Sequence, residues 1–464
     1  MNSYKQKIIN SFDNAVSYEQ SAHMQKIVVK RLVNFIKTMD IDFSQPISIL
    51  EIGCGTGLLT QYLTELFPKA QFLITDISVR MIERVKEKYN NNPNIEFKVM
   101  DGEAIDLEHS FDLIVSSLAF QWFENLEQSL QSITALLNPN GYLVCSTLAQ
   151  KSFEEWRQLY TQNHCHYSFQ SYPDVKTLES YWPSKVGGGF WQAETIIESV
   201  ENGIDFIKGL RNIGAHTSSN MHKPLSAGQL RKIIAQFDLN YGYTTYEVAL
   251  GSFRRYAAKG FFVTGTDTDV GKTFVSACLT KALNATYWKP MQTGLKSDFG
   301  DSKTVQILAQ TCDNQIIPPL VALQEPLSPE AAAKLEEIRL DINKLDFFLA
   351  TQNRPYIVEG AGGVLVPIAD SQYMIQMMQK VNLPVVIVAR TELGTLNHTL
   401  LTIEVLRNHH IPIAGVILNG NQNLANKEAI ERHGNIEVIA EVPRIDQITD
   451  QFIAQFKQEI TLFY

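Results

Sequence analysis

The stretch Gly265-Thr-Asp-Thr-Asp-Val-Gly-Lys-Thr273 constrains the fold more than any other part of the sequence. It follows a short apolar run, Phe261–Thr264, that predicts a buried strand, and it precedes Phe274–Leu283, whose spacing predicts a helix. Glycines at such a junction let backbone N–H groups face a phosphate at the positive end of the helix. Lys272 can reach the outer phosphates of a nucleotide, and the Thr273 hydroxyl can bind Mg²⁺. Five residues separate the glycines instead of the usual four, so a glycine-rich turn with an exposed lysine is the alternative.

Strand-like apolar runs alternate with helical spacing twice along the 464 residues. The first series runs from about residue 47 to 252, and the second begins at about residue 260. Such alternation predicts an α/β protein with two doubly wound parallel sheets, in domains 1–255 and 256–464. Residues 150–240 are aromatic and irregular, with helical patches, and they predict a helical cap over the carboxyl edge of the first sheet.

Composition excludes several classes of protein. The net charge of -9 argues against nonspecific nucleic-acid binding. The five cysteines are scattered and odd in number, which argues against a disulfide framework or a zinc site and favours a reducing compartment. No apolar run reaches membrane-spanning length, so we expect no membrane partner and a cytoplasmic location.

A second glycine-rich turn, Glu51-Ile-Gly53-Cys-Gly55-Thr-Gly57, lies between a predicted strand and a predicted helix in the first half. Its glycines permit close approach of a ligand, and Glu51 can accept a hydrogen bond from an ammonium group. Asp76 closes the next predicted strand, where a carboxylate can accept from ribose hydroxyls. A dinucleotide such as NAD is the alternative ligand.

This turn resembles motif I of class I S-adenosylmethionine methyltransferases, which have a Rossmann-like fold, and Asp101-Gly102 resembles their adenine contact. Three further stretches, Ile9–His23, Ser117–Trp122 and Leu210–Thr217, look like the malonyl-[acyl-carrier protein] O-methyltransferases of biotin synthesis. The similarity covers about residues 7–254. It implies S-adenosylmethionine as cofactor, a carrier protein bearing malonyl as partner, and esterification of the free malonyl carboxylate.

Three residues are candidates for contact with the acyl substrate. Trp122 and Tyr18, together with Phe120, could form an aromatic wall near the transferred methyl group, although core packing is the alternative. Arg211 could hold the malonyl carboxylate, although it could equally be a surface charge. The carboxylate is ionised at neutral pH, so the reaction needs no general base, and catalysis is mainly alignment.

The second half resembles dethiobiotin synthetase over about residues 260–462. The phosphate loop, whose long spacing is a feature of that family, carries the likeness together with several stretches that follow in order. These are Lys289–Gly294, Gly300-Asp301, Glu325–Pro329, Glu359–Gly363 and Leu393–His398. The resemblance implies a P-loop NTPase-like fold that uses ATP, Mg²⁺, CO₂ and 7,8-diaminopelargonate to close a cyclic urea through a carbamate. Asp269 stands where the family usually has Glu.

The resemblance also implies the roles of individual residues. Thr273, Asp301 and Glu359 supply oxygen ligands suited to Mg²⁺, although Asp301 could instead cap a helix. The catalytic residues are Lys272 and Lys289, which neutralise phosphate and carbamate charge, and Thr293, which donates a hydrogen bond. The expected nucleotide contacts are Thr268, Asp269, Val270, Gly271, Lys272, Thr273, Asn419 and Pro443. The expected diamine contacts are Thr293, Gly394, Thr395 and Asn397, in a site that the family completes across a homodimer interface.

Two other functions remain open at this point. The chain could be a generic small-acid methyltransferase fused to a partner-regulated P-loop ATPase, whose hydrolysis would depend on a partner and not on a diamine. It could also be a binding scaffold with inactive sites, but the Asp269 change is the only departure from the expected ligands.

Overall fold

The computed structural model describes residues 3–13, 22–167, 169–212, 225–347, 349, 354–445 and 447–460. The chain divides into two compact units. Unit 1 comprises Met1–Pro183 and Gly189–Arg255, and unit 2 comprises Ser184–Gly188 and Tyr256–Tyr464. Each unit has its own large sheet. None of the described helices combines the length and the apolar character that a membrane span requires.

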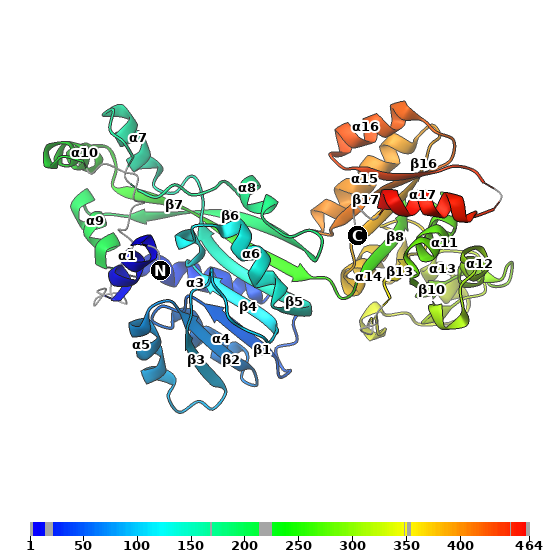
Figure 1. The fold of residues 1–464 in the computed structure, drawn as a ribbon, viewed down its shortest axis with the longest axis horizontal. Helices are drawn as coiled ribbons and strands as arrows, with labels where there is room; N and C mark the ends of the chain where they lie inside the picture. Colours follow the sequence, from blue (N-terminus) through cyan, green and yellow to red (C-terminus); the bar gives the residue numbers. More distant parts are fainter. Residues whose placement is uncertain are drawn as a thin grey trace. The chain divides into compact units, whose positions relative to one another are not determined.

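Unit 1 is built on a seven-stranded sheet in the order β3-β2-β1-β4-β5-β7-β6 (Figure 1). The first five strands pair in parallel, and β7 runs antiparallel to β5. Both faces of the central strands are covered, which explains the nearly continuous apolar run of the buried strand β4. The strands are β1 Ser48–Ile52, β2 Gln71–Asp76, β3 Ile95–Val99, β4 Phe111–Ser117, β5 Leu137–Leu148, β6 Gly187–Ser199 and β7 Tyr243–Arg255.

The helices of unit 1 bury one apolar stripe each. In the helix after β2, for example, Met81, Ile82 and Val85 are buried while the flanking basic residues are not, and the Ser78 hydroxyl caps its first turn. The helices are α1 Ser3–Asp13, α3 His23–Ile36, α4 Leu58–Leu66, α5 Val79–Tyr89, η1 Phe120–Trp122, α6 Leu126–Ala135, α7 Glu154–Gln162, α8 Val175–Ser180, α9 Gly203–Asn212 and α10 Ala227–Asn240.

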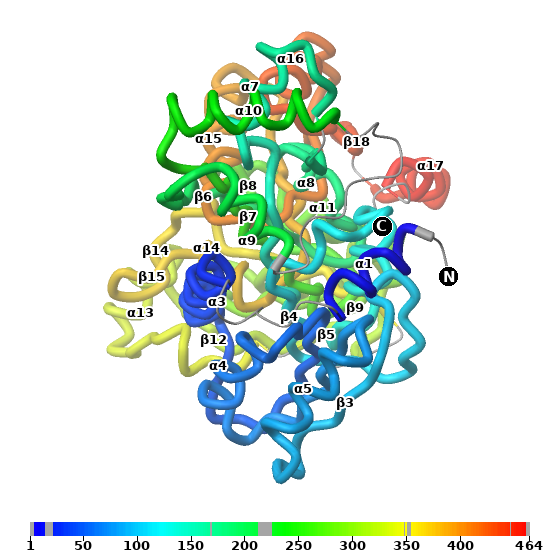
Figure 2. Tube along the Cα trace, turned by 90° about the vertical axis from the view of Figure 1, so that its left-hand side faces the viewer, coloured from blue at the N-terminus to red at the C-terminus, as the bar shows by residue number. Residues whose placement is uncertain are grey.

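The segment expected to be a helical cap contains more than helices. Helices α7, α9 and α10 gather at one end of unit 1 (Figures 1 and 2), where Trp156 stacks on Phe237 with ring centroids 4.3 Å apart. The 13 residues of β6, however, form an edge strand of the main sheet beside β7. The prediction missed this strand because Gly187-Gly188-Gly189 at its start indicates a turn, and because an edge strand with many exposed residues lacks a continuous apolar run.

Unit 2 repeats the architecture with a different strand order. Its seven-stranded sheet has the order β11-β9-β13-β8-β16-β17-β18, and every pairing in it is parallel. The strands are β8 Gly260–Gly265, β9 Thr286–Trp288, β11 Ile316–Ile317, β13 Tyr356–Glu359, β16 Val385–Arg390, β17 Ile413–Asn419 and β18 Val438–Val442. Two small sheets pair β10 Met291–Gln292 with β12 Val321–Ala322, and β14 Pro367–Ala369 with β15 Gln372–Tyr373.

One core of unit 2 joins the sheet to the helix that follows the phosphate loop. Phe261, Val263 and Ile357 from the strands pack with Val275 and Leu279 from that helix. The helices are α11 Lys272–Leu283, α12 Gly300–Ala309, η2 Asp313–Gln315, α13 Pro329–Leu335, η3 Ile342–Lys344, α14 Met374–Val381, α15 Thr395–Asn408, α16 Leu424–Gly434 and α17 Asp450–Ile460. The doubly wound α/β fold predicted for both halves is confirmed.

Candidate active sites

The glycine turn of unit 1 follows the carboxyl end of β1 and leads into α4. Gly53, Gly55 and Gly57 all have positive φ, at 73°, 53° and 83°. A Cβ on Gly53 would lie 2.5 Å from the Cβ of Ala119, so no larger residue fits there. The turn therefore brings its backbone close to the carboxyl edge of the sheet, where ligands bind in open α/β folds.

Asp76, at the end of β2, holds this turn in place. Its Oδ2 accepts from the Gly55 N–H at 2.9 Å, and its Oδ1 accepts from the Ser78 N–H at 2.8 Å. Burial raises the pKa of Asp76 to about 6, and these backbone donors oppose the rise. Each oxygen keeps a further lone pair, so Asp76 can still accept from a ligand hydroxyl in the adjoining pocket.

Glu51 lies beneath the turn and does not line the pocket. Its side chain is buried, and Oε2 accepts from the Thr60 hydroxyl at 2.7 Å. Burial raises the pKa of Glu51 to about 8, and the nearby Asp76 carboxylate adds to the rise. Glu51 is therefore mostly protonated at neutral pH in this structure.

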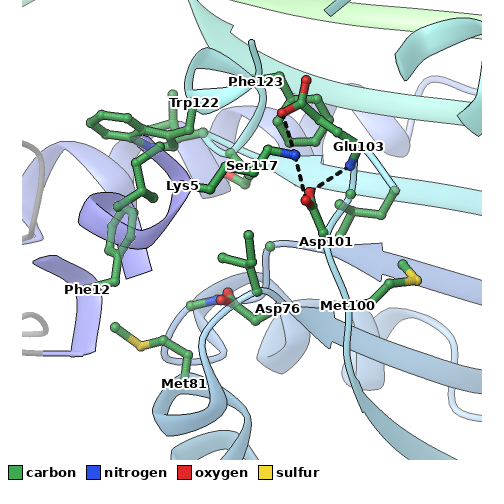
Figure 3. Close-up of a pocket in the computed structure, with 18 residues that line it drawn as sticks. Lys5, Phe12, Asp76, Met81, Met100, Asp101, Glu103, Ser117, Trp122 and Phe123 are labelled. Atoms are coloured by element: carbon green, nitrogen blue, oxygen red, sulfur yellow. Dashed lines mark hydrogen bonds and ion pairs between the residues drawn. The ribbon is translucent and has the colours of Figure 1, made fainter. Parts of the chain in front are cut away.

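A pocket opens over the turn at the carboxyl edge of the sheet (Figure 3). A Cβ on Gly102 would meet the Phe123 ring at 2.6 Å, so this wall also depends on a glycine. Trp122 packs edge to face with Phe12, with ring centroids 5.7 Å apart. The lining residues are Lys5, Ile8, Phe12, Ile52, Gly53, Gly55, Asp76, Ile77, Met81, Met100, Asp101, Gly102, Glu103, Ser117, Leu118, Ala119, Trp122 and Phe123.

Sequence reasoning missed the part that α1 plays in this pocket. Lys5 reaches across to two acids beyond β3, with Nζ 2.5 Å from Asp101 Oδ2 and 3.1 Å from Glu103 Oε2 (Figure 3). Burial opposes the charge of Lys5, but the two carboxylates outweigh it and raise its pKa. Lys5, Ile8 and Phe12 are spaced three and four residues apart, so one helix face supplies all three. This helical spacing is the feature of the sequence that could have identified α1 as a wall of the pocket.

The other predicted substrate residues of unit 1 lie elsewhere. Phe120 is buried and packs on Phe123 with ring centroids 5.0 Å apart, as a core residue does. Arg211 is exposed in the last turn of α9 and is not among the residues that line the pocket. Tyr18 lies outside the described residues.

In unit 2 the phosphate loop leaves β8 and enters α11 through Gly271. Gly271 has a φ of 91°, and a Cβ there would lie 1.9 Å from Asn419 Nδ2. Asn419, at the end of β17, donates from Nδ2 to the Val270 carbonyl at 2.9 Å and so supports the loop from beneath. Asp269 also has a positive φ, 58°, and is exposed, as is Thr268.

Four side chains converge at the start of α11. The Thr273 hydroxyl lies 2.9 Å from Asp301 Oδ1 and 3.0 Å from Glu359 Oε1. Lys289 Nζ lies 2.7 Å from Asp301 Oδ2 and 2.9 Å from Glu359 Oε1, and it also donates to the Gly360 carbonyl at 3.0 Å. The strands β9 and β13 and the helices α11 and α12 thus bring together residues far apart in the sequence.

The charges in this cluster are strongly coupled. Burial would lower the pKa of Lys289, but Glu359 and Asp301 outweigh it and raise that pKa. Burial would raise the pKa of Asp301, but Lys289 holds it below its ordinary value. Lys272 Nζ donates to the Asp267 carbonyl at 3.1 Å and forms no ion pair with a carboxylate among the described residues, and burial together with the Lys289 charge lowers its pKa. Two ammonium groups near two carboxylates make a site suited to a polyanion.

The donor set also fits a magnesium ion. A threonine hydroxyl and two carboxylates are the hard oxygen ligands that Mg²⁺ prefers, and Mg²⁺ usually takes its remaining ligands from water and phosphate. The described residues contain no cluster of three or more His, Cys, Asp or Glu that could hold a metal alone. The site therefore fits an ion shared with a nucleotide.

The predicted diamine residues lie around two other turns. Thr293 is half-buried and precedes Gly294, which has a φ of 83°. Gly394, with a φ of 94°, precedes the first residue of α15, Thr395, which is buried. Asn397 is exposed on the same helix, and Pro443 is exposed just after β18.

Comparison with known proteins supports the family resemblance of each half of the chain. A family model described as a methyltransferase domain matches residues 50–145, and one described as an AAA domain matches residues 259–451. An ATP-dependent dethiobiotin synthetase of Paramagnetospirillum magneticum is 47% identical over 42% of this chain and 93% of its own length. A malonyl-[acyl-carrier protein] O-methyltransferase of Magnetococcus marinus is 36% identical over 54% of this chain and 92% of its own length.

One relative spans both units. The biotin biosynthesis bifunctional protein BioCD of Bordetella avium is 40% identical over 456 residues, which cover 98% of this chain and 95% of that protein. Identity at this level along nearly the whole of both proteins shows that the chain belongs to the family of bifunctional biotin biosynthesis proteins, in which a methyltransferase is joined to a dethiobiotin synthetase.

Proposed function

We propose that domain 1–255 methylates the free carboxylate of a malonyl thioester on acyl-carrier protein, and that domain 256–464 forms dethiobiotin from 7,8-diaminopelargonate, CO₂ and ATP. The observation that carries this proposal is the likeness to a bifunctional relative over 98% of the chain. The glycine turn with Asp76 in unit 1 and the Thr273 cluster in unit 2 give each activity a suitable site.

In unit 1, S-adenosylmethionine would supply an electrophilic methyl group on a sulfonium. The turn at Gly53–Gly57 and Asp76 would hold its ribose end, and Asp101 with Gly102 would contact the adenine. Trp122 and Phe12 provide an apolar wall that would exclude water from the transfer. The malonyl carboxylate is already ionised at neutral pH, so the task of the protein is to align it. Tyr18 and Arg211 are our candidates for holding the substrate.

In unit 2, Thr273, Asp301 and Glu359 would hold Mg²⁺, which would balance charge on the ATP phosphates. Lys272 and Lys289 would neutralise the phosphate and carbamate oxygens, and Thr293 would donate to them. The phosphate loop and the ends of β17 and β18 would bind the rest of the nucleotide. The residues we assign to nucleotide binding are Thr268, Asp269, Val270, Gly271, Asn419 and Pro443.

We further propose that unit 2 forms a homodimer and that the dimer completes the diamine site. Gly394, Thr395 and Asn397 lie at the first turn of α15. The N-terminus of this helix is its positive end, and it would bind the substrate carboxylate there. The preceding Leu393 is fully exposed, and a nearby groove includes exposed Leu365 and Leu401. Apolar side chains exposed beside a proposed site are typical of a surface that another subunit covers.

We also propose a cytoplasmic location for the protein, because its five cysteines are free, which is typical of a reducing compartment.

The experiment that tests both activities uses the purified full chain. Labelled S-adenosylmethionine should methylate malonyl carrier protein, and ATP with Mg²⁺, bicarbonate and the diamine should yield dethiobiotin. Methylation of many small acids without preference for malonyl, or ATP hydrolysis that ignores the diamine, would favour the generic methyltransferase joined to a regulated ATPase.

A further inference from the structure

A buried tyrosine contacts one of the carboxylates of the Thr273 cluster. Tyr287 is fully buried, and its hydroxyl donates to Glu359 Oε2 over 2.9 Å. The other oxygen, Oε1, accepts from Lys289 Nζ at 2.9 Å and from the Thr273 hydroxyl at 3.0 Å. The two oxygens of Glu359 therefore have separate sets of donors, and the described residues place no other hydrogen-bond donor on Oε2.

The register of two parallel strands creates this contact. Tyr287 on β9 lies opposite Ile357 on β13. Side chains along a strand alternate between faces, so Glu359, two residues after Ile357, points to the same face as Ile357 and Tyr287. Tyr287 and Ile357 share the core that includes Phe261. The tyrosine ring is therefore held by packing, and the sheet sets the position of its hydroxyl.

We propose that Tyr287 is a positioning residue for the magnesium site of unit 2. By holding Oε2, its hydroxyl keeps Oε1 of Glu359 directed toward Thr273 and Lys289. The inference rests on the proposed function of unit 2. The Glu359 side chain is 0% exposed, so without the phenol Oε2 would lose its donor with no water to replace it. The carboxylate would then turn away from the geometry in which it can serve as a ligand.

The test removes the hydroxyl and keeps the ring. In the full-length Tyr287→Phe variant, binding of Mn²⁺ is measured by electron paramagnetic resonance with a non-hydrolysable ATP analogue present. We expect Mn²⁺ affinity to fall about tenfold, as it does when hydrogen-bond partners of metal ligands are removed. Dethiobiotin formation should need more Mg²⁺, while the KM for the diamine stays unchanged. Methyl transfer by unit 1 in the same sample reports the concentration of the chain, and the thermal unfolding transition of unit 2 reports whether unit 2 is folded.

Two further variants separate positioning from simple stability. Thr280→Val removes another fully buried hydroxyl of unit 2, one that donates to the Ser276 carbonyl within α11 at 2.7 Å. It should leave Mn²⁺ affinity unchanged. Tyr287→Met removes both ring and hydroxyl and should weaken Mn²⁺ binding at least as much as Tyr287→Phe, which covers the case in which one variant does not fold.

Wild-type Mn²⁺ affinity in Tyr287→Phe would overturn the inference, and so would an equal loss in Thr280→Val. Failure of the proposed function would look different. The wild-type chain would then make no dethiobiotin, whereas the comparison of Mn²⁺ affinities between the variants would still decide the role of Tyr287.

Discussion

Glu51 is a buried acid whose protonation depends on the fold. Burial raises its pKa from 4.5 to about 8, so the folded chain keeps a proton that the unfolded chain releases over this range. A group with a raised pKa contributes stability that is full below its unfolded pKa and is lost as the pH rises through its folded pKa. The pKa of Asp76 rises only to about 6, so the window from pH 6 to pH 8 reports mainly on Glu51.

Glu51→Gln should therefore flatten the pH dependence of unit 1 stability. Wild-type unit 1 should lose unfolding free energy between pH 6 and pH 8, by an amount on the order of a few kcal/mol. The glutamine stays neutral, so the variant should lose much less. Tryptophan fluorescence during urea unfolding follows the change, because four of the five tryptophans belong to unit 1. Glu65→Gln, an exposed position on α4, is the control; equal slopes in wild type and Glu51→Gln would contradict the prediction.

Substitution of Arg211 tests how unit 1 selects its acyl substrate. Malonyl thioesters differ from neutral acyl thioesters by one terminal carboxylate, and a planar guanidinium can bind both of its oxygens. Arg211→Ala should lower kcat/KM for malonyl carrier protein at least tenfold, with S-adenosylmethionine affinity unchanged. Arg211→Lys should restore part of the loss.

Lys208→Ala, on the same helix, is the matched control for Arg211, because Lys208 pairs with Asp205 at 3.2 Å. If Arg211→Ala methylates malonyl carrier protein at the wild-type rate, Arg211 is a surface charge, and another cation reads the carboxylate.

At the scale of elements, α1 forms one wall of the unit 1 pocket and is tied to the opposite rim by Lys5. The helix contributes Ile8 and Phe12 to the lining, and the ion pairs of Lys5 with Asp101 and Glu103 are less than one-fifth exposed. Such pairs are screened less by water than surface pairs are. The position of α1 therefore depends on a contact with the segment that we assign to adenine binding.

Lys5→Met should weaken binding of S-adenosylhomocysteine about fivefold or more in calorimetry, because α1 loses its anchor and two acids lose their partner. Lys7→Met, an exposed position on α1 outside the pocket, should bind as wild type does. Unchanged binding in Lys5→Met would remove the anchoring role, and tighter binding would mean that Lys5 competes with the cofactor for Asp101.

These elements also show what the sequence could predict. The central strands of both sheets were recognised because strands covered on both faces carry continuous apolar runs, as β4 and β16 do. The edge strand β6 was missed because partial exposure breaks such a run. The two glycine turns could also be predicted, because each lies between a strand-like run and a helical pattern that are adjacent in the sequence.

Contacts between distant segments could not be predicted in this way. Lys5 and Asp101 are 96 residues apart, and Tyr287 and Glu359 are 72 apart. Neither pair leaves a periodic pattern, because the sheet order and the strand register bring them together. The resemblance to known families supplied the residues that we propose as ligands of the phosphate site, but it said nothing about the residues that hold those side chains in place.

At the scale of the whole molecule, two complete sheets with separate cores are joined in one chain. The residues that we assign to methyl transfer all lie in unit 1, and those that we assign to urea closure all lie in unit 2. Joining two enzymes ensures that both are made in equal amounts. We therefore expect the two activities to be independent in the purified chain.

Lys289→Ala is the sharpest test of this independence. Lys289 is 5% exposed in its side chain and lies within 3 Å of both Asp301 and Glu359. Its removal leaves the buried Glu359 and the half-buried Asp301 without their main cation, and it takes away a charge that would stabilise the reacting phosphate and carbamate. Dethiobiotin formation should become undetectable, whereas methyl transfer to malonyl carrier protein should stay near the wild-type rate.

Lys296→Ala provides the matched control for Lys289→Ala. Lys296 also belongs to unit 2, but it is 71% exposed, and within the described part of the chain its one ion pair is with Glu325, at 3.1 Å. An exposed pair of this kind contributes little to stability, so both activities should survive its loss. If Lys289→Ala lowered methyl transfer as much as dethiobiotin formation while thermal unfolding showed an intact unit 1, the two units would be coupled. The methyltransferase would then depend on the charge state of a site in the other half of the chain.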